Sequence, residues 1–238
     1  SLDRVIYTYD KDSKEWSEHI RFTCQQPSFT PLAATDKGWL VTGSKFSPSG
    51  ELVEYNDTNA LYLYNPETRE FSEKLYQDPN YDVGGFTGTC RNASGGAGVD
   101  YDTRKLLYVT YEAQEPVKIY FDDEIAEIYN GLDAVFPNEW VSVVTRDKDR
   151  NKMVIRVSSP SNPGDYYFYN REQSQLIPLY TYAPWIDRKI MAETIPVKYT
   201  ARDGLVIPAY LTLTKKKTDK NYMIVLPHGG PNTKQRIG

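Results

Sequence analysis

The chain has 238 residues, of which 39% are hydrophobic and 13% are aromatic, and 20 of them are tyrosines. The aromatic content excludes a disordered chain, and the net charge of −4, without a long basic block, argues against nucleic acid as a partner. No apolar run reaches the roughly 18–20 residues of a membrane-spanning helix, so no membrane partner is expected either. The two cysteines, Cys24 and Cys90, form no metal or redox motif, and no cofactor or metal is predicted.

One hairpin pattern recurs along the first part of the chain. Each copy has a strand of aromatic and aliphatic residues, a short polar turn, and a second alternating strand. The copies stand about 50 residues apart, which is a period typical of repeat folds. Equivalent tyrosines of the first strands are Tyr9, Tyr64, Tyr120 and Tyr169, and the second strands are expected at 16–20, 71–75, 124–128 and 174–180.

Further strands are predicted between the hairpins, at Leu106–Tyr111 and Met153–Val157. Four short strands in each ~40–50 residues are typical of β-propeller blades. We therefore expect a mostly β chain in which residues 1–180 form the C-terminal part of a β-propeller, with about three to four blades. A generic β-sandwich also spaces its strands regularly, but it does not require the same hairpin to recur at a nearly constant period.

A polar segment between two of these strands imitates a calcium loop. Asp147, Asp149 and Asn151 have the spacing of the first calcium ligands, but Lys152 stands where the loop requires glycine. We therefore predict a turn that connects two strands. The histidine in this part of the chain, His19, lies on a predicted strand and is expected at the surface.

The pattern changes after the last hairpin. Residues 181–194 are expected to form a linker with a short helix, because Pro184 suits the first helical turn and apolar residues follow it. Two strand-like runs, 196–201 and 205–213, then flank Asp203-Gly204. An Asp-Gly pair between such runs predicts a β-hairpin.

The apolar run Tyr222–Leu226 predicts a buried strand, which leads into His228, Gly229 and Gly230. Glycines after such a strand let backbone N–H groups face a substrate oxygen. In α/β-hydrolases a loop of this type lines the oxyanion hole. We therefore expect residues 195–238 to begin an α/β-hydrolase domain, with these three residues as the oxyanion-side loop of its catalytic site.

The nucleophile of such an enzyme is missing from the sequence. No Gly-x-Ser-x-Gly motif occurs, and in this fold the serine, acid and histidine of the triad all follow the oxyanion loop. The first residue is a serine rather than a methionine, and Gly238 ends the sequence shortly after the loop. We therefore expect a fragment that is truncated at both ends and is inactive by itself.

A more specific resemblance is carried by three segments. They are Ala183-Pro-Trp-Ile-Asp187, Tyr199-Thr-Ala-Arg-Asp-Gly-Leu-Val-Ile-Pro-Ala-Tyr-Leu-Thr-Leu213 and Val225-Leu-Pro-His-Gly-Gly-Pro231. These segments resemble the propeller-to-hydrolase junction of the prolyl oligopeptidase family, and they are closest to its acylaminoacyl-peptidase and dipeptidyl-aminopeptidase-like branch. The resemblance implies a serine peptidase whose α/β-hydrolase domain is capped by a propeller that restricts entry to short peptides.

The resemblance also implies roles for the loop residues. His228 sits where related enzymes place a tyrosine or histidine, and an imidazole N–H or a nearby backbone N–H there stabilises the tetrahedral intermediate. Gly229 and Gly230 let the backbone approach the substrate. After Pro231 the chain departs from the branch, since Asn-Thr-Lys-Gln stands where close relatives often carry an aromatic residue and an Arg-Asp pair.

The expected function is that of a fragment of a serine oligopeptidase, whose parent protein hydrolyses short peptides by acyl transfer. A non-enzymatic propeller-type binding module is the first alternative, and an esterase or lipase with a similar loop is the second. The loop at His228 argues against a plain binding module, while a preceding propeller argues by analogy against an esterase. The oligomeric state is left open by the sequence.

Overall fold

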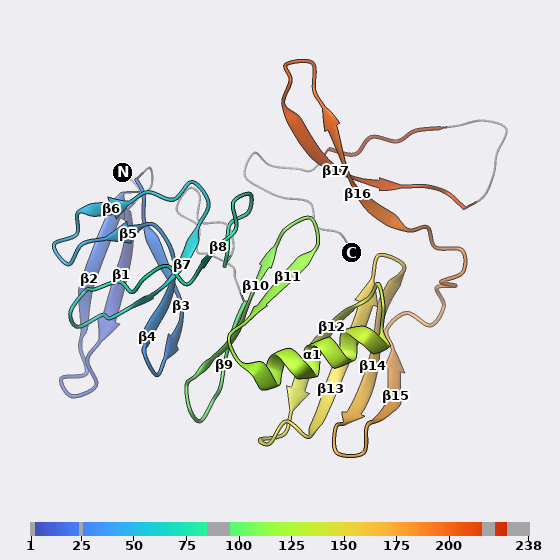
Figure 1. Ribbon diagram of the computed structural model, residues 1–238, viewed down its shortest axis with the longest axis horizontal. Helices are drawn as coiled ribbons and strands as arrows, with labels where there is room; N and C mark the ends of the chain where they lie inside the picture. The colour runs from blue at the N-terminus through green and yellow to red at the C-terminus, as the bar shows by residue number, and fades with distance from the viewer. Residues whose placement is uncertain (1–2, 24–25, 85–95, 216–221, 228–238) are drawn as a thin grey trace. The chain divides into compact units, whose positions relative to one another are not determined.

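The computed structural model describes residues 3–23, 26–84, 96–215 and 222–227 (Figure 1). These residues are mostly β, with several separate antiparallel sheets and one α-helix, α1 (Asp123–Val135). Two compact units are distinguished, residues 1–125 and 126–238. Within the described ranges, no helix has the length and apolar character that crossing a membrane requires.

The first unit is built from antiparallel strands that mostly pair with their neighbours in sequence. A short hairpin, β5–β6, is inserted between the second and third strands of its central sheet. The sheets are the hairpin β1 (Asp3–Tyr9) and β2 (Trp16–Thr23); the central sheet β3 (Phe29–Thr35), β4 (Gly38–Gly43), β7 (Ala60–Tyr64) and β8 (Tyr76–Gln77); the inserted β5 (Lys45–Phe46) and β6 (Leu52–Glu54); and β9 (Gly96–Val99), β10 (Leu106–Glu112) and β11 (Pro116–Tyr120).

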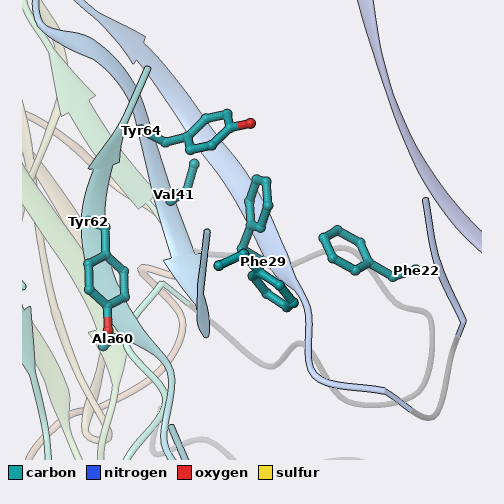
Figure 2. Close-up of a cluster of buried hydrophobic side chains, with 7 residues drawn as sticks. Phe22, Phe29, Val41, Ala60, Tyr62 and Tyr64 are labelled. Atoms are coloured by element: carbon teal, nitrogen blue, oxygen red, sulfur yellow. The ribbon is translucent and has the colours of Figure 1, made fainter. Parts of the chain in front are cut away.

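One face of the central sheet is covered by an aromatic cluster (Figure 2). Phe29 is fully buried, and its ring meets the ring of Phe22 from β2 edge-on, with centroids 5.3 Å apart. Tyr62 and Tyr64 of β7 lie on the same face because their side chains alternate with that of Leu61. Burying side chains of this size stabilises the fold by ~1.5–3 kcal/mol each, so this cluster holds the β1–β2 side of the unit to the sheet.

The other face of the central sheet carries a second buried cluster. Leu40 of β4 and Leu61 of β7 point to this side and pack with Val109 and Tyr111 of β10. Burial alternates along β10, where Leu107, Val109 and Tyr111 are buried and their neighbours are less so. Sheets therefore stack face to face on both sides of the central sheet.

The second unit contains a four-stranded meander and a separate hairpin. Met153, Ile155 and Val157 alternate along the second strand of the meander and are buried on one face. The meander is β12 (Trp140–Arg146), β13 (Lys152–Ser159), β14 (Asn162–Asn170) and β15 (Gln175–Thr181), and the hairpin is β16 (Thr194–Thr200) and β17 (Val206–Thr212).

The helix α1 covers the apolar face of this meander (Figure 1). Ile155 pairs with Tyr167 across β13 and β14, so the two side chains share that face. The ring of Phe136, which directly follows α1, lies 5.2 Å from the ring of Tyr167. Buried Ile128 and Leu132 of α1 complete the packing of a helix against one face of a sheet.

The predicted second strand at 124–128 is wrong, because these residues belong to α1. Asp122 caps the helix, since its carboxylate accepts a hydrogen bond from the Ile125 backbone N–H at 3.0 Å. The helix has an apolar stripe at the helical period, formed by Ile125, Ile128, Tyr129 and Leu132, all buried. A short apolar run fits both periods, and here the cap and the longer stripe select the helix.

The other hairpin predictions agree with the structure to different degrees. The first and last copies form β1–β2 and β14–β15, but the second copy has only an isolated bridge between Tyr64 and Phe71 and the short strand β8. Tyr64, Tyr120 and Tyr169 each lie on the third strand of their sheets in chain order, whereas Tyr9 lies on the first strand of a hairpin.

Four local predictions are confirmed. The runs Leu106–Tyr111 and Met153–Val157 are β10 and β13, and the Asp203-Gly204 hairpin is β16–β17. The segment that imitates a calcium loop is the turn between β12 and β13. There the Asp147 carboxylate accepts hydrogen bonds from the backbone N–H groups of Asn151 and Lys152, at 2.9 and 3.1 Å.

Two predictions around the junction are wrong. The expected helix within 181–194 is replaced by turns, because the Asp187 carboxylate accepts the Lys189 backbone N–H at 3.0 Å and favours a local turn over a helix. The expected buried strand Tyr222–Leu226 has no strand pairing, and its side chains are 74% to 90% exposed. A strand requires a neighbour to satisfy its backbone, and none of the described residues pairs with this run.

His19 is buried, so its expected surface position is also wrong. Only 8% of the residue is exposed, and its Nε2 atom lies 2.6 Å from the hydroxyl of Tyr64, in a hydrogen bond. Its ring centroid is 5.4 Å from that of Trp39. Burial, together with the nearby charge of Arg69, lowers the pKa of the His19 imidazole. The hydrogen bond to Tyr64 allows a polar ring to be buried between β2 and the central sheet.

The lowered pKa of His19 predicts a stability that depends on pH. The unfolded chain binds a proton to this residue more readily than the folded chain, so stability is complete above the unfolded pKa of about 6.5 and falls as the pH drops below it. Melting temperatures between pH 7.5 and pH 5 measure the effect. His19→Gln should reduce this slope, whereas His228→Gln should keep it, and equal slopes in both variants would assign the effect elsewhere.

Candidate functional site

The catalytic residues predicted from the sequence, His228, Gly229 and Gly230, lie outside the described residues. Their role as an oxyanion loop stays a prediction. Pro227 is described, and it follows the exposed run Tyr222–Leu226. The described part of the chain offers a different candidate site, which lies in the second unit.

This candidate site is a cleft of about 770 Å³ beside strands β14 and β15. Its volume falls within the ~300–1,000 Å³ that small-ligand sites occupy. One wall comes from the two strands, and the other comes from the turn segment that follows β15. The lining residues are 165–167, 178–181 and 184–188.

An ion pair between a buried carboxylate and a half-exposed guanidinium joins the two walls of the cleft. Asp165 of β14 is 9% exposed, and its Oδ1 atom lies 2.5 Å from a guanidinium nitrogen of Arg188 in the turn segment. The hydroxyl of Thr181 donates a hydrogen bond to the same oxygen at 2.9 Å. Asp165 therefore connects its own strand, the end of β15 and the segment beyond it.

The ionisation of this pair follows from its surroundings. Burial by itself raises the pKa of Asp165, but the hydrogen bonds from Arg188 and Thr181 outweigh burial and hold the pKa below its usual value. The hydrogen bond to Asp165 in turn raises the pKa of Arg188. Burial and the Asp165 charge raise the pKa of Tyr167, whose phenol therefore stays neutral. At neutral pH the cleft thus contains a charged pair beside the neutral phenol of Tyr167.

The corner between β13 and β14 holds the carboxylate in place. Asn162 is 1% exposed, and its amide donates to Asp165 Oδ2 at 3.4 Å and to Glu139 Oε1 at 3.1 Å. Its Oδ1 atom accepts the backbone N–H of Gly164 at 3.0 Å. Gly164 has a φ of +145°, and a Cβ there would lie 2.8 Å from Nε of Arg156, so this position favours glycine.

The rest of the cleft is mainly aromatic and apolar. The rings of Tyr166 and Tyr180 are 6.0 Å apart, and Trp185 is 79% exposed on the facing segment. None of the residues that line the cleft is a serine, cysteine or histidine. The Thr181 hydroxyl is engaged by Asp165, so the cleft is suited to binding or docking rather than to nucleophilic chemistry.

Sequence reasoning missed this cleft. Asp165 and Arg188 belong to no local motif, since one lies on a strand and the other lies in a turn beyond the next strand. Only the pairing of β14 with β15, followed by the turns after Thr181, brings them together. The neighbouring segment Ala183–Asp187 does belong to the family resemblance described above. That resemblance indicates the junction between domains and does not indicate a binding site.

Comparisons with known proteins identify two distant relatives, while no protein-family profile matches the chain. Dipeptidyl aminopeptidase BIII of Pseudoxanthomonas mexicana is 28% identical over 152 residues, which cover 60% of this chain and 22% of that protein. Dipeptidyl peptidase family member 6 of Caenorhabditis elegans is 25% identical over 255 residues, which cover 95% of this chain and 31% of that protein. The chain is therefore similar to proteins named as dipeptidyl peptidases, and it spans less than a third of their length.

The buried amide of Asn162 predicts a measurable loss of stability on truncation. Asn162→Ala leaves the Gly164 N–H without its acceptor, and a buried group left unpaired costs about 1–3 kcal/mol. The matched control is Asn170→Ala, which removes only the two exposed turn hydrogen bonds with Gln173 and should change stability by less than ~0.5 kcal/mol. Urea unfolding of both variants measures the difference. Equal losses would show that the corner does not depend on Asn162.

Proposed function

We propose that this chain is part of a serine peptidase of the prolyl oligopeptidase family, in its dipeptidyl-aminopeptidase-like branch, that acts on short peptides. The observation that carries the proposal is the similarity to a dipeptidyl peptidase family member along 95% of the chain. The junction segments Ala183–Asp187, Tyr199–Leu213 and Val225–Pro231 support the same family, because they resemble its propeller-to-hydrolase junction.

The proposal includes an architecture for the parent protein. Residues 1–180 supply consecutive blades of a β-propeller, 181–194 supply the linker, and 195–238 begin the α/β-hydrolase domain. Two four-stranded antiparallel sheets, β3-β4-β7-β8 and β12-β13-β14-β15, have the strand number and order of propeller blades. The face-to-face packing on both sides of β4 and β7 also supports blades. In this arrangement the propeller restricts the active site to short peptides.

The proposed chemistry assigns this chain the oxyanion side of the reaction. As the peptide carbonyl becomes tetrahedral, an N–H group of the His228 loop donates to the developing negative charge. Gly229 and Gly230 let the backbone come close to that oxygen, because they carry no side chain. The nucleophile, acid and base come from residues outside this sequence, which has no Gly-x-Ser-x-Gly motif.

The missing nucleophile predicts that these 238 residues are inactive alone. A polypeptide of this sequence should hydrolyse neither peptides nor esters, and it should not react with a fluorophosphonate probe, whereas the full-length protein should label at one serine. Labelling followed by peptide mapping measures both. Stoichiometric labelling of a serine within this chain would refute the assignment, and a full-length protein that does not label would favour the binding-module alternative.

The oxyanion role predicts the effect of His228→Ala in the full-length protein. If the imidazole donates chiefly in the transition state, kcat for a dipeptidyl amide substrate should fall by ~10²–10³, with KM within a few-fold. His19→Gln is the matched control, because His19 is buried against Tyr64 in the first unit and should leave kcat unchanged. An unchanged kcat with a lower Tm for His228→Ala would make His228 a structural residue.

A further inference from the structure

The segment 182–193 connects the β12–β15 meander to the hairpin β16–β17 and contains turns but no regular element. Its Ala183 is buried, while Trp185 and Ile190 are 79% and 75% exposed. Apolar burial therefore anchors the start of the segment but leaves its middle exposed. The half-buried Ile186 and polar contacts hold that middle part in position.

Three such contacts join the segment to the meander, one of them the hydrogen bond that the Tyr180 hydroxyl of β15 donates to the Tyr182 carbonyl at 3.4 Å. At its start, the backbone N–H of Tyr182 donates to the carbonyl of Gly164 at 2.8 Å. In its middle, Arg188 forms the 2.5 Å ion pair with Asp165. The Asp165 side chain is 12% exposed and the Arg188 side chain is 37% exposed, so the carboxylate belongs to the rigid corner and the guanidinium reaches it from the segment.

We propose that the Asp165–Arg188 pair is a latch, which holds segment 182–193 against β14 and closes one wall of the cleft. When the latch opens, the segment swings away from the meander around Tyr182–Ala183. The cleft then loses its wall at 184–188, and the base of the β16–β17 hairpin is released.

The structure favours an opening that leaves the sheet folded. Asp165 keeps the hydrogen bonds from Thr181 and Asn162 after Arg188 leaves, so the buried carboxylate is not left without donors. Arg188 is already partly exposed and becomes hydrated on opening. None of the residues that line the cleft belongs to β13, and neither charged group of the latch lies on that strand. We therefore expect the free energy of this local opening to be smaller than the free energy of global unfolding.

The test is native-state proteolysis of the full chain by an endoproteinase that cleaves after lysine. Lys189 is exposed, directly follows Arg188 and reports on the segment. Arg188→Gln should accelerate cleavage after Lys189 by about tenfold, because it shifts the local opening equilibrium. The matched control is Arg171→Gln, which removes the looser 3.9 Å pair with exposed Glu127 and should leave this cleavage rate unchanged.

Hydrogen exchange separates a latch from general destabilisation. Amides of β13 should stay protected in Arg188→Gln while those of Ile190 and Met191, which donate to Asp187 and Arg188, exchange faster. The double variant Asp165→Asn with Arg188→Gln removes both charges of the pair and should show the same pattern. An unchanged cleavage rate in both variants would overturn the latch. Parallel loss of β13 protection in both would also overturn it, since the pair would then stabilise the whole sheet.

Discussion

A sheet with apolar side chains on both faces must be covered on both faces, and the first unit depends on this constraint. Along β4 and β7, Val41 and Tyr62 point to one side while Leu40 and Leu61 point to the other. An antiparallel sheet that faces water would place polar side chains on one of these sides. The β1–β2 hairpin and the sheet β9–β11 supply the two covers, so stacking of sheets, rather than closure of one sheet, organises this unit.

The second unit meets the same requirement with a helix. The apolar face of the meander, with Ile155 and Val157, is covered by α1. The buried polar side chains of the meander include Asn162 and Asp165, which lie near the start of β14 and are hydrogen-bonded to each other. A satisfied buried network of this kind specifies one geometry, because any displacement leaves a polar group unpaired. The ion pair between Arg188 and Asp165 connects the segment after β15 to this network.

In the proposed peptidase, the part of this chain that controls access differs from the part that contributes to the reaction. The stacked sheets restrict access, and the cleft beside β14 contains an ion pair and aromatic rings but no nucleophile among its lining residues. The loop at His228 supplies only the oxyanion side. The turn segment 182–193 lies between the meander and the His228 loop in the chain. Its ion pair with the meander is seen in the structure and does not depend on the peptidase assignment.

Sequence alone determined the features whose causes are local. Alternation of side chains predicted β10 and β13, and Asp203-Gly204 predicted the hairpin β16–β17, because a turn and its flanking strands form their hydrogen bonds with near neighbours. Tertiary structure decided the rest. The burial of His19 depends on Tyr64, 45 residues away, and the Asp165–Arg188 pair depends on how β14 and β15 align. No local pattern encodes these contacts, since the partner of each buried polar group is brought to it only when distant strands pack.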